Sequence, residues 1–513
     1  MKNNNIPKIP AEKFQFVDDS NRLHDQKFDT KQISYFRDAF NRFCKNKSSV
    51  TAACIIICLV LYSIVVPLFC ETTYSQALTD TNYLNYTKLL PKNDLFADLG
   101  LGFWDGASLQ TQSTANYNYI RAIGEETGMD VIVGEPKIYK DENGKTLYDI
   151  RVDSYVYNGF MYMTFTESQY QDIMKWQNEN GIQIIYPAVT VANSSDANIW
   201  YEATRQGIAS LDSKGNFVNI YRTSGQDGNY DSLRIDGDPG KDDPDAPDRY
   251  RYANITGTSS AISYKCRVFK YTYFQYRYGF EPTFLFGTNA LGQDVLTRLA
   301  AGARFSLMFA VLVSVINLSI GAVIGAIEGY YGGAVDMIME RVIDILARVP
   351  FMVVATLFQL HLAKKVGVVP SMLFAFVLTG WIGMAGTTRM QFYRFKGQEY
   401  VLAARVLGAS DWRIMFRHIF PNSLGTIITS AVLVIPGVIF SESSLTYLGI
   451  VNLDSSTMTS VGTMLANGRQ YLSSFPHVIL FPAAFISLLM ISFNLFGNGL
   501  RDAFNPSLRG ADE

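Results

Sequence analysis

The stretch EYVLAARVLGASDWRIMFRHIFPN, residues Glu399–Asn422, is polar and basic. It nevertheless stands between two apolar runs, 366–388 and 423–441, each long enough to cross most of a bilayer. We expect Gly408 to end a first short helix in a left-handed conformation. A second short helix should follow it, and Pro421 should stop that helix. Two short helices at a bend on the membrane face would form a surface that a soluble protein can bind.

This stretch resembles the EAA loop of ABC-importer permeases, which in that family sits in a groove of the ATPase subunit and transmits ATP binding to the membrane. It departs from the family pattern at Leu402, where Glu is usual, and at Phe420, where Leu is usual. The alternative is a solvated basic loop that only orients the protein. The resemblance implies that the ATPase-coupling residues are Glu399, Ala403, Ala404, Gly408, Ile419 and Pro421.

Two further stretches carry the resemblance. FGTNALGQDVLTRLAAGARFSL, residues 286–307, is similar to the entry into the second span of C-type oligopeptide and dipeptide permeases, and NLFGNGLRDAFNP, residues 494–506, is similar to their ending. Read without the family, 286–307 predicts an amphipathic segment on the outer surface that then enters the membrane. The resemblance covers residues 286–506 well, the first span weakly, and the residues between them not at all.

Apolar residues make up 48% of the chain and charged residues only 18%, which fits a polytopic membrane protein. Short segments expected inside hold 15 Lys and Arg against five on the outside flanks, so both termini and residues 399–422 should be cytoplasmic. Residues 1–47 form a polar tail. Six spans are expected, at 50–69, 305–327, 343–363, 366–388, 423–441 and 478–500.

Residues 75–280 interrupt this pattern and carry 19 Lys and Arg against 26 Asp and Glu, a net charge of −7. Their length and aromatic content predict a folded mixed α/β domain of about 200 residues rather than a disordered loop. A helix is expected at Glu167–Asn178, and because the first span runs outward, the domain should be extracellular. It either docks a delivering protein or shields the permease. Strands are expected at Met129–Val133, Tyr148–Tyr157, Phe160–Phe165 and Ile182–Tyr186.

Three features could be mistaken for a calcium site, a disulfide or a phosphate-binding loop, and we do not expect them to act as such. The acidic run Asp236–Asp248 has no EF-hand spacing and indicates an exposed loop more than a calcium site. Cys70 and Cys266 are either bridged or, as we favour, free, and no metal-binding spacing is present. Gly144-Lys145-Thr146 lacks the earlier glycine of a phosphate-binding loop. We therefore expect no metal or cofactor on this chain, with ATP and Mg on partner ATPases.

Charged and small residues inside the spans need separate explanations. Glu442, just past the fifth span, either faces the translocation pathway or caps the span at the outer interface. Gly321 and Gly325 form a G-xxx-G pair, which either permits close helix packing or is an ordinary membrane feature.

These observations predict an all-α permease of the type I ABC-importer kind, with six spans and a large extracellular insert, in the bacterial cell membrane. The resemblance implies import of oligopeptides, without enzymatic activity of its own. It also implies a homologous permease subunit, two ATPases, an extracellular substrate-binding lipoprotein and membrane lipid as partners, and no nucleic acid. Import of dipeptides, nickel or another small solute is the first alternative. A membrane-anchored receptor or adhesion protein is the second.

Overall fold

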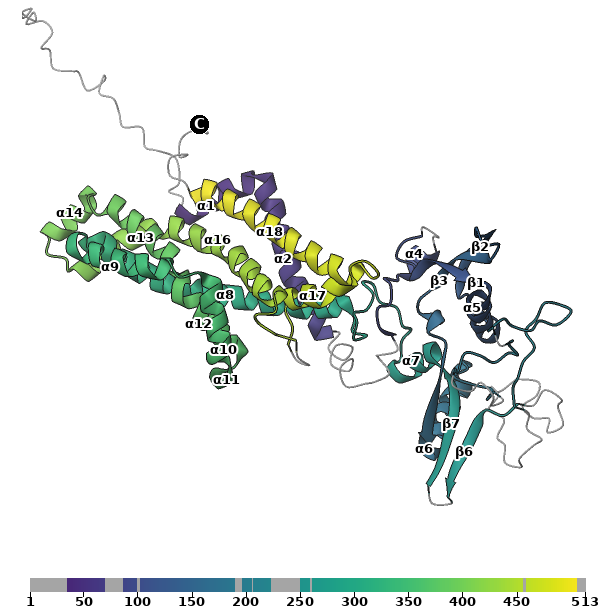
Figure 1. Ribbon diagram of the computed structural model, residues 1–513. Coiled ribbons are helices and arrows are strands. Elements are labelled where there is room, and N and C mark those ends of the chain that lie inside the picture. Colours follow the sequence, from purple (N-terminus) through teal and green to yellow (C-terminus); the bar gives the residue numbers. More distant parts are fainter. Residues whose placement is uncertain are drawn as a thin grey trace, which may run out of the picture.

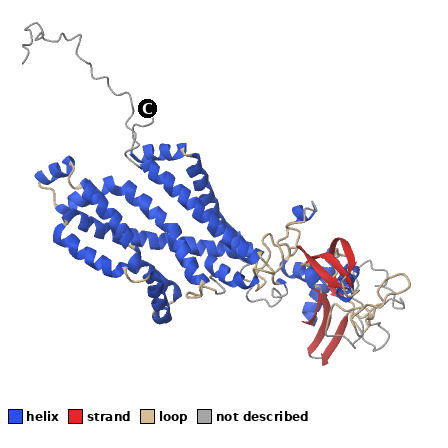
Figure 2. Cartoon of the chain, turned by 45° about the horizontal axis from the view of Figure 1, so that its top comes forward, coloured by secondary structure: helices blue, strands red, loops and turns tan. Residues whose placement is uncertain are grey.

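The computed structural model describes residues 35–69, 86–98, 102–189, 196–204, 206–222, 250–258, 261–454 and 458–504. A long helical bundle forms one part of the molecule, and a smaller part at one end of it contains the strands (Figure 1). Helices run through the bundle from end to end, while the described strands all lie in the smaller part (Figure 2). We call residues 107–278 the strand domain.

Five helical stretches in the described residues are long and apolar enough to cross a membrane, and a bent helix pair makes a sixth if it counts as one span. A helix satisfies its own backbone hydrogen bonds, which is why apolar runs of this length adopt it in lipid. The chain is therefore a polytopic membrane protein. The five stretches are α2 (Lys47–Phe69), α8 (Val295–Tyr331), α12 with α13 (Val368–Phe395), α15 to α16 (Asp411–Tyr447) and α18 (His477–Phe504).

The helices run past the apolar stretches that predicted them. α8 covers 37 residues instead of the expected 305–327, and its first turns are buried rather than exposed. The segment expected at 286–307 does lead into the apolar helix, but the amphipathic surface position expected for it is wrong for the part within α8, which is buried. Polar residues continue the helix at both ends because other parts of the chain pack over them.

The bent pair consists of α9 (Gly333–Ala347) and α10 (Phe351–His361), which meet at 72°. The segment between the expected spans 305–327 and 343–363 is mostly helical, since α8 continues to Tyr331 and α9 begins after the turn at Gly332. Pro350 stands at the break as the N-cap of α10. Proline disfavours a helical conformation in the residue before it, so the straight span expected at 343–363 bends here.

α12 (Val368–Gly380) and α13 (Ile382–Phe395) follow the short α11 (Ala363–Val366) and extend the expected span 366–388 into the basic segment. α13 packs closely on α8. A Cβ added at Gly321 would lie 2.6 Å from Met384 Cβ, and one at Gly325 would lie 2.2 Å from the Ala385 carbonyl oxygen. Close packing through the glycine pair is thus confirmed, and Gly329 continues the same line against Phe392.

The strand domain holds two antiparallel sheets. In the first, β3 (Thr146–Asp153) lies between β1 (Ala107–Ser113) and β2 (Ile132–Lys140), and α5 (Thr114–Thr127) packs on them. In the second, β7 (Ala261–Phe269) pairs with β4 (Phe160–Thr166), β5 (Ile185–Tyr186) and β6 (Ala253–Thr258). The associated helices are α6 (Glu167–Asn180) and α7 (Lys270–Tyr278).

Local signals predicted some of these elements well and others badly. The strand at Phe160–Phe165 and the helix from Glu167 are found almost as expected, with Thr166 forming a capping box at the helix start. The strand expected at Met129–Val133 starts later, at Ile132, because α5 ends at Gly128 in a left-handed conformation just before it. The sequence reading missed α5, β1, β6 and β7.

The remaining helices are short. α1 (Tyr35–Lys45) packs on α18 through Phe43 and Phe496, whose ring centroids are 5.4 Å apart. α17 (Val461–Gly468) lies at the end of the bundle nearest the strand domain (Figure 1). The others are α4 (Asp94–Asp98), α14 (Glu399–Val406), α15 (Asp411–Arg413) and the 3₁₀ turns η4 (Val156–Asn158) and η7 (Arg469–Tyr471).

Candidate functional site

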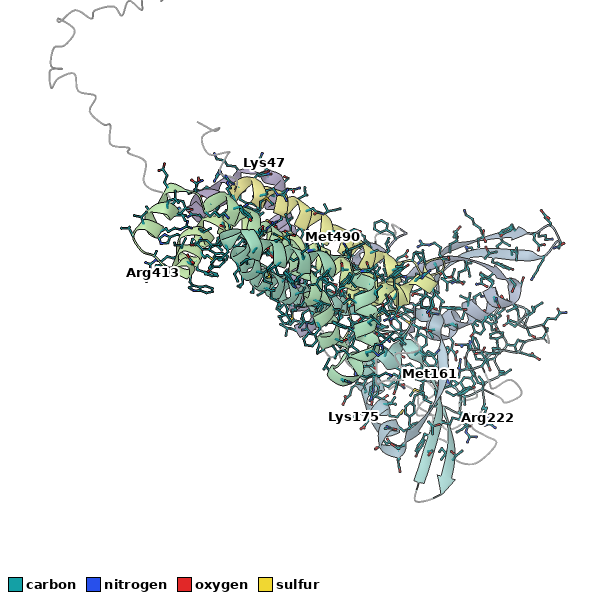
Figure 3. The ribbon with its side chains drawn as sticks, turned by 60° about the vertical axis from the view of Figure 1, so that its left-hand side comes forward. Lys47, Met161, Lys175, Arg222, Arg413 and Met490 are labelled. Carbon is teal, nitrogen blue, oxygen red and sulfur yellow. The ribbon has the colours of Figure 1, made fainter. Side chains whose placement is uncertain are left out.

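The loop between α13 and α16 lies at the end of the bundle opposite the strand domain (Figure 1). Arg413, in this loop, lies far from Met161 and Arg222 of the strand domain (Figure 3). The loop forms the expected bend: α14 ends at Val406, and Gly408 follows with φ of 79°. A left-handed turn of this kind favours glycine, so the prediction for Gly408 is confirmed.

Pro421 does not stop a helix, contrary to expectation. α15 passes into the π-helix η6 (Ile414–Ile419), and this leads without a break into α16 (Phe420–Tyr447). Pro421 stands in the first turn of α16, after the π-helical segment. A proline in a continuous α-helix would leave the carbonyl four residues earlier without a donor, and the wider π-turn changes that pairing.

The loop is fixed to the end of α8. The Tyr330 hydroxyl donates a hydrogen bond of 2.6 Å to Asp411, and the Arg405 guanidinium lies 5.7 Å from the centre of the Tyr330 ring. Lys396 donates to the Gly329 carbonyl at 2.9 Å. An apolar cluster beneath these contacts includes Ala326, Tyr330, Phe392, Val401, Ile414, Met415 and Ile419.

The coupling residues expected from the sequence fall into two groups. Ala404 and Ile419 are buried, with 9% and 0% of their surface exposed, so they hold the loop together from inside. The other four are exposed and lie on the loop surface, namely Glu399, Ala403, Gly408 and Pro421. The structure thus divides the expected set into residues that support the loop and residues that a partner can touch.

Sequence reasoning missed the most exposed apolar side chains of this loop. Val406 is 87% exposed, Leu407 86% and Trp412 62%. We call these three residues the apolar knob. They lie within seven consecutive residues of the loop, and a patch of exposed apolar side chains usually marks a surface for another protein. The available signal was an apolar Val-Leu pair directly before the turn glycine.

The opposite end of α8 is fixed to the chain segments that enter and leave the strand domain. We call residues 86–92 and 281–294, with His477 of α18, the joint. Thr288 is fully buried, donates to the Tyr86 carbonyl and accepts from the Leu89 amide at 2.9 Å. Gly287 has φ of 71°, and a Cβ there would lie 2.3 Å from the Leu89 oxygen. The two segments are therefore interlocked.

Aromatic side chains add to the joint. Phe481 of α18 stacks on Phe286 with centroids 4.0 Å apart and on Trp104 at 6.2 Å. The Trp104 indole donates to the Leu285 carbonyl at 2.6 Å. Through these contacts the strand domain is attached to α8 and α18 by a packed interface instead of a loose tether.

A buried ion pair joins the two halves of the strand domain. Arg267 of β7 is fully buried and binds Glu126 of α5 through two nitrogens. It also donates to the carbonyls of Ala197 and Pro187. Burial alone lowers the pKa of the Arg267 guanidinium, but the Glu126 carboxylate outweighs this and raises that pKa overall. The Tyr221 hydroxyl donates a further hydrogen bond of 2.8 Å to the Glu126 carboxylate.

Glu442 is fully buried within α16. Ser306 of α8 donates to its Oε2 at 2.8 Å and Ser443 at 3.3 Å, while Oε1 has no hydrogen-bond partner among the described residues. Both alternatives for Glu442, a place in the translocation pathway and a cap at the outer end of the span, stay predictions.

The remaining features concern possible metal ligands, thiols and the Gly144-Lys145-Thr146 turn. Within the described ranges, no group of three His, Cys, Asp or Glu side chains is placed to hold a metal ion. Cys266 is buried in β7 as a free thiol, and burial raises its pKa to about 12. Lys145 lies in the turn between β2 and β3, where the Asp141 amide donates a hydrogen bond to the Lys145 carbonyl. Cys70 and Asp236–Asp248 lie outside the described residues.

Comparison with known proteins gives two family matches. Residues 318–510 match the binding-protein-dependent transport system inner membrane component, and residues 34–91 match the N-terminal transmembrane domain of oligopeptide transport permease C. Residues 92–317, which include the strand domain, lie between the two matches.

Individual relatives agree with these matches. The oligopeptide transport system permease protein OppC of Bacillus subtilis is 42% identical over 224 residues, which is 44% of this chain and 72% of the relative. The dipeptide transport system permease protein DppC of the same organism is 40% identical over 44% of this chain and 69% of the relative. OppC of Escherichia coli is 36% identical, over 45% and 74% respectively.

Proposed function

Because this chain belongs to the C-type permease subunits of ABC importers for oligopeptides and dipeptides, we propose that it forms half of a peptide-translocation pathway in a bacterial plasma membrane. The observation that carries this is the 42% identity across 72% of a curated oligopeptide permease. Peptides are the substrates named for these relatives, which favours peptides over nickel. A second permease subunit completes the pathway.

The apolar knob is the proposed contact with an ATPase subunit, which binds ATP and Mg. Val406, Leu407 and Trp412 project from a loop whose base is bonded to Tyr330 and packed on Phe392. A pull on the knob is therefore transmitted directly to α8 and α13. Family membership argues against the receptor or adhesion alternative. The exposed apolar knob also argues against it, because a protein that is only anchored in the membrane needs no such surface.

The knob is proposed to be cytoplasmic and the strand domain extracellular, which follows from the excess of Lys and Arg in the short segments at the loop end. Both termini lie on the cytoplasmic side in this orientation. The test uses single cysteines at Leu407 and Leu109, which are 86% and 72% exposed, in a variant without the native cysteines. A membrane-impermeant thiol reagent should label position 109 in intact cells and position 407 only after lysis.

The strand domain is proposed to dock the substrate-binding lipoprotein. Its exposed apolar residues include Leu109 and Ile138, at 72% and 61%, and its rigid joint connects it to α8. A shield would need neither feature. The two ideas are separated by replacing residues 107–278 with a short flexible linker, which keeps the joint residues 86–92 and 281–294 in the chain.

The transport test uses the tagged chain, its partner permease, the ATPases and the binding protein in vesicles. We expect the ATPases to copurify with the chain and peptide uptake to require ATP. In the linker variant, the basal ATPase rate should persist while stimulation by the binding protein and uptake fall. Normal stimulation in that variant would reject docking, and failure of the intact complex to take up any peptide would reject the peptide importer itself.

A further inference from the structure

A cavity of about 290 Å³ lies at the end of the bundle nearest the strand domain. Its walls come from the start of α8, from α17 and the segments on either side of it, and from the first turn of α18, which lie together at that end (Figure 1). Cavities that enclose small ligands begin at about 300 Å³. This space therefore suits one end of an extended ligand better than a whole peptide.

The cavity contains a buried cation. Arg298 of α8 is only 2% exposed and lines the cavity, where it donates a hydrogen bond of 2.5 Å to the Asp454 carboxylate. Asn467 of α17 donates to the other oxygen of Asp454 at 2.9 Å. The planar guanidinium fits a carboxylate in geometry as well as in charge. In this conformation, the chain itself supplies the carboxylate.

Other groups in the wall are suited to an anion. Thr459 also lines the cavity, is 2% exposed, and its hydroxyl has no hydrogen-bond partner within the described part of the chain. Buried polar atoms are nearly always paired, so this hydroxyl is available to something that enters. Tyr471 lines the cavity as well, and the Lys88 ammonium lies 4.7 Å from the centre of its ring.

We propose that this cavity binds the C-terminal carboxylate of the transported peptide, with Arg298 as its principal partner. Asp454 then acts as a built-in competitor that occupies Arg298 until a peptide displaces it. Leu291, Met464 and Val478 in the wall would receive the terminal side chain. The inference rests on the proposed function, in that it takes peptides as the substrates.

The proposal predicts opposite effects for the two members of the ion pair. Arg298→Gln removes the group that binds the carboxylate, so transport should lose preference for a free-acid peptide over its C-terminal amide. Asp454→Asn removes the competitor and keeps the cation, so that preference should increase. If the pair were only a latch that closes the bundle, either change would loosen it in the same way.

The experiment measures uptake of one peptide as free acid and as amide by the complete transporter in vesicles. All samples contain the same binding protein, so its own preference cancels when variants are compared with the wild type. We expect Arg298→Gln to lower the acid-to-amide ratio about tenfold, the usual scale for a lost charge-assisted hydrogen bond. Asp454→Asn should raise the ratio. Arg121→Lys, in an exposed ion pair with Glu125, is the control and should leave it unchanged.

An unchanged ratio in both variants, with uptake intact, would overturn the inference. Equal increases in basal ATPase rate without a change in ratio would establish a latch instead. Weaker binding of the peptide-free binding protein to Arg298→Gln, again without a change in ratio, would assign Arg298 to a carboxylate of that protein. If Arg298→Gln fails to fold, the effect of Asp454→Asn on the acid-to-amide uptake ratio decides. An increase supports the inference, and a decrease or no change overturns it. No uptake by the wild type would overturn the proposed function as well.

Discussion

The two ends of α8 are held in different ways. At the loop end, Tyr330 anchors a loop that leaves Leu407 and Trp412 open to solvent. At the other end, Thr288 and Gly287 lie in an interlocked joint in which a single added carbon would clash. Under the proposed function, this difference matches what each end meets. An end made for another subunit keeps apolar surface exposed until that subunit arrives, whereas an end that meets its own chain buries that surface on folding.

Glu126→Gln should have the largest effect, and this effect falls on the stability of the strand domain. Arg267 would stay buried but lose the carboxylate that compensates its charge. Loss of one member of a buried ion pair lowers the free energy of unfolding by about 3–5 kcal/mol. We expect the strand domain to become sensitive to protease while ATPase copurification through the knob persists. Limited proteolysis of the purified complex measures the first effect. Unchanged protease resistance would show that the ion pair does not hold the two sheets together.

The joint itself is tested by Gly287→Ala. The left-handed backbone costs about 1–2 kcal/mol for a residue with a Cβ. The contact with the Leu89 oxygen adds an overpacking cost of about 1–3 kcal/mol. Gly279→Ala is the matched control, because φ there is 76° but nothing lies within 4 Å of the added carbon. The thermal midpoint should fall further for Gly287→Ala than for Gly279→Ala, and equal falls would mean that the joint can relax.

The knob is tested by Leu407→Ser. Exposed positions usually tolerate substitution within about 0.5 kcal/mol of unfolding free energy, so the chain should fold normally. A central apolar contact in an interface is worth about 2 kcal/mol or more, so ATPase binding should weaken roughly 30-fold. Leu109→Ser makes the same chemical change at the other end of the molecule. Equal ATPase affinity in both variants would exclude the knob from the interface.

The smallest expected effect is that of Tyr330→Phe, which removes the hydrogen bond to Asp411 and keeps the packing. A hydrogen bond of this kind contributes about 1 kcal/mol, somewhat more when one partner is charged. We expect ATPase binding to survive and the coupling of ATP hydrolysis to uptake to decrease. The ratio of peptide transported to ATP hydrolysed measures this. An unchanged ratio would show that Tyr330 does not transmit movement to α8.

The sequence by itself determined the helical bundle, the position of the loop and the turn at Gly408. Apolar runs of spanning length have few alternatives in lipid, and glycine readily adopts the left-handed conformation required there. Local patterns of the same kind found the strand at Phe160 and the helix after Thr166, since caps and strand propensity act over a few neighbouring residues.

Tertiary structure alone decided the rest. The burial of Ile419 and the exposure of Leu407 depend on which face of a short helix meets α8, and no local pattern fixes that face. Pro421 continues a helix because η6 widens before it. The meeting of Arg298 with Asp454, and of Arg267 with Glu126, joins residues more than a hundred positions apart. Such pairs form only when packing brings distant segments together, which is why the sequence named the loop but not its exposed surface.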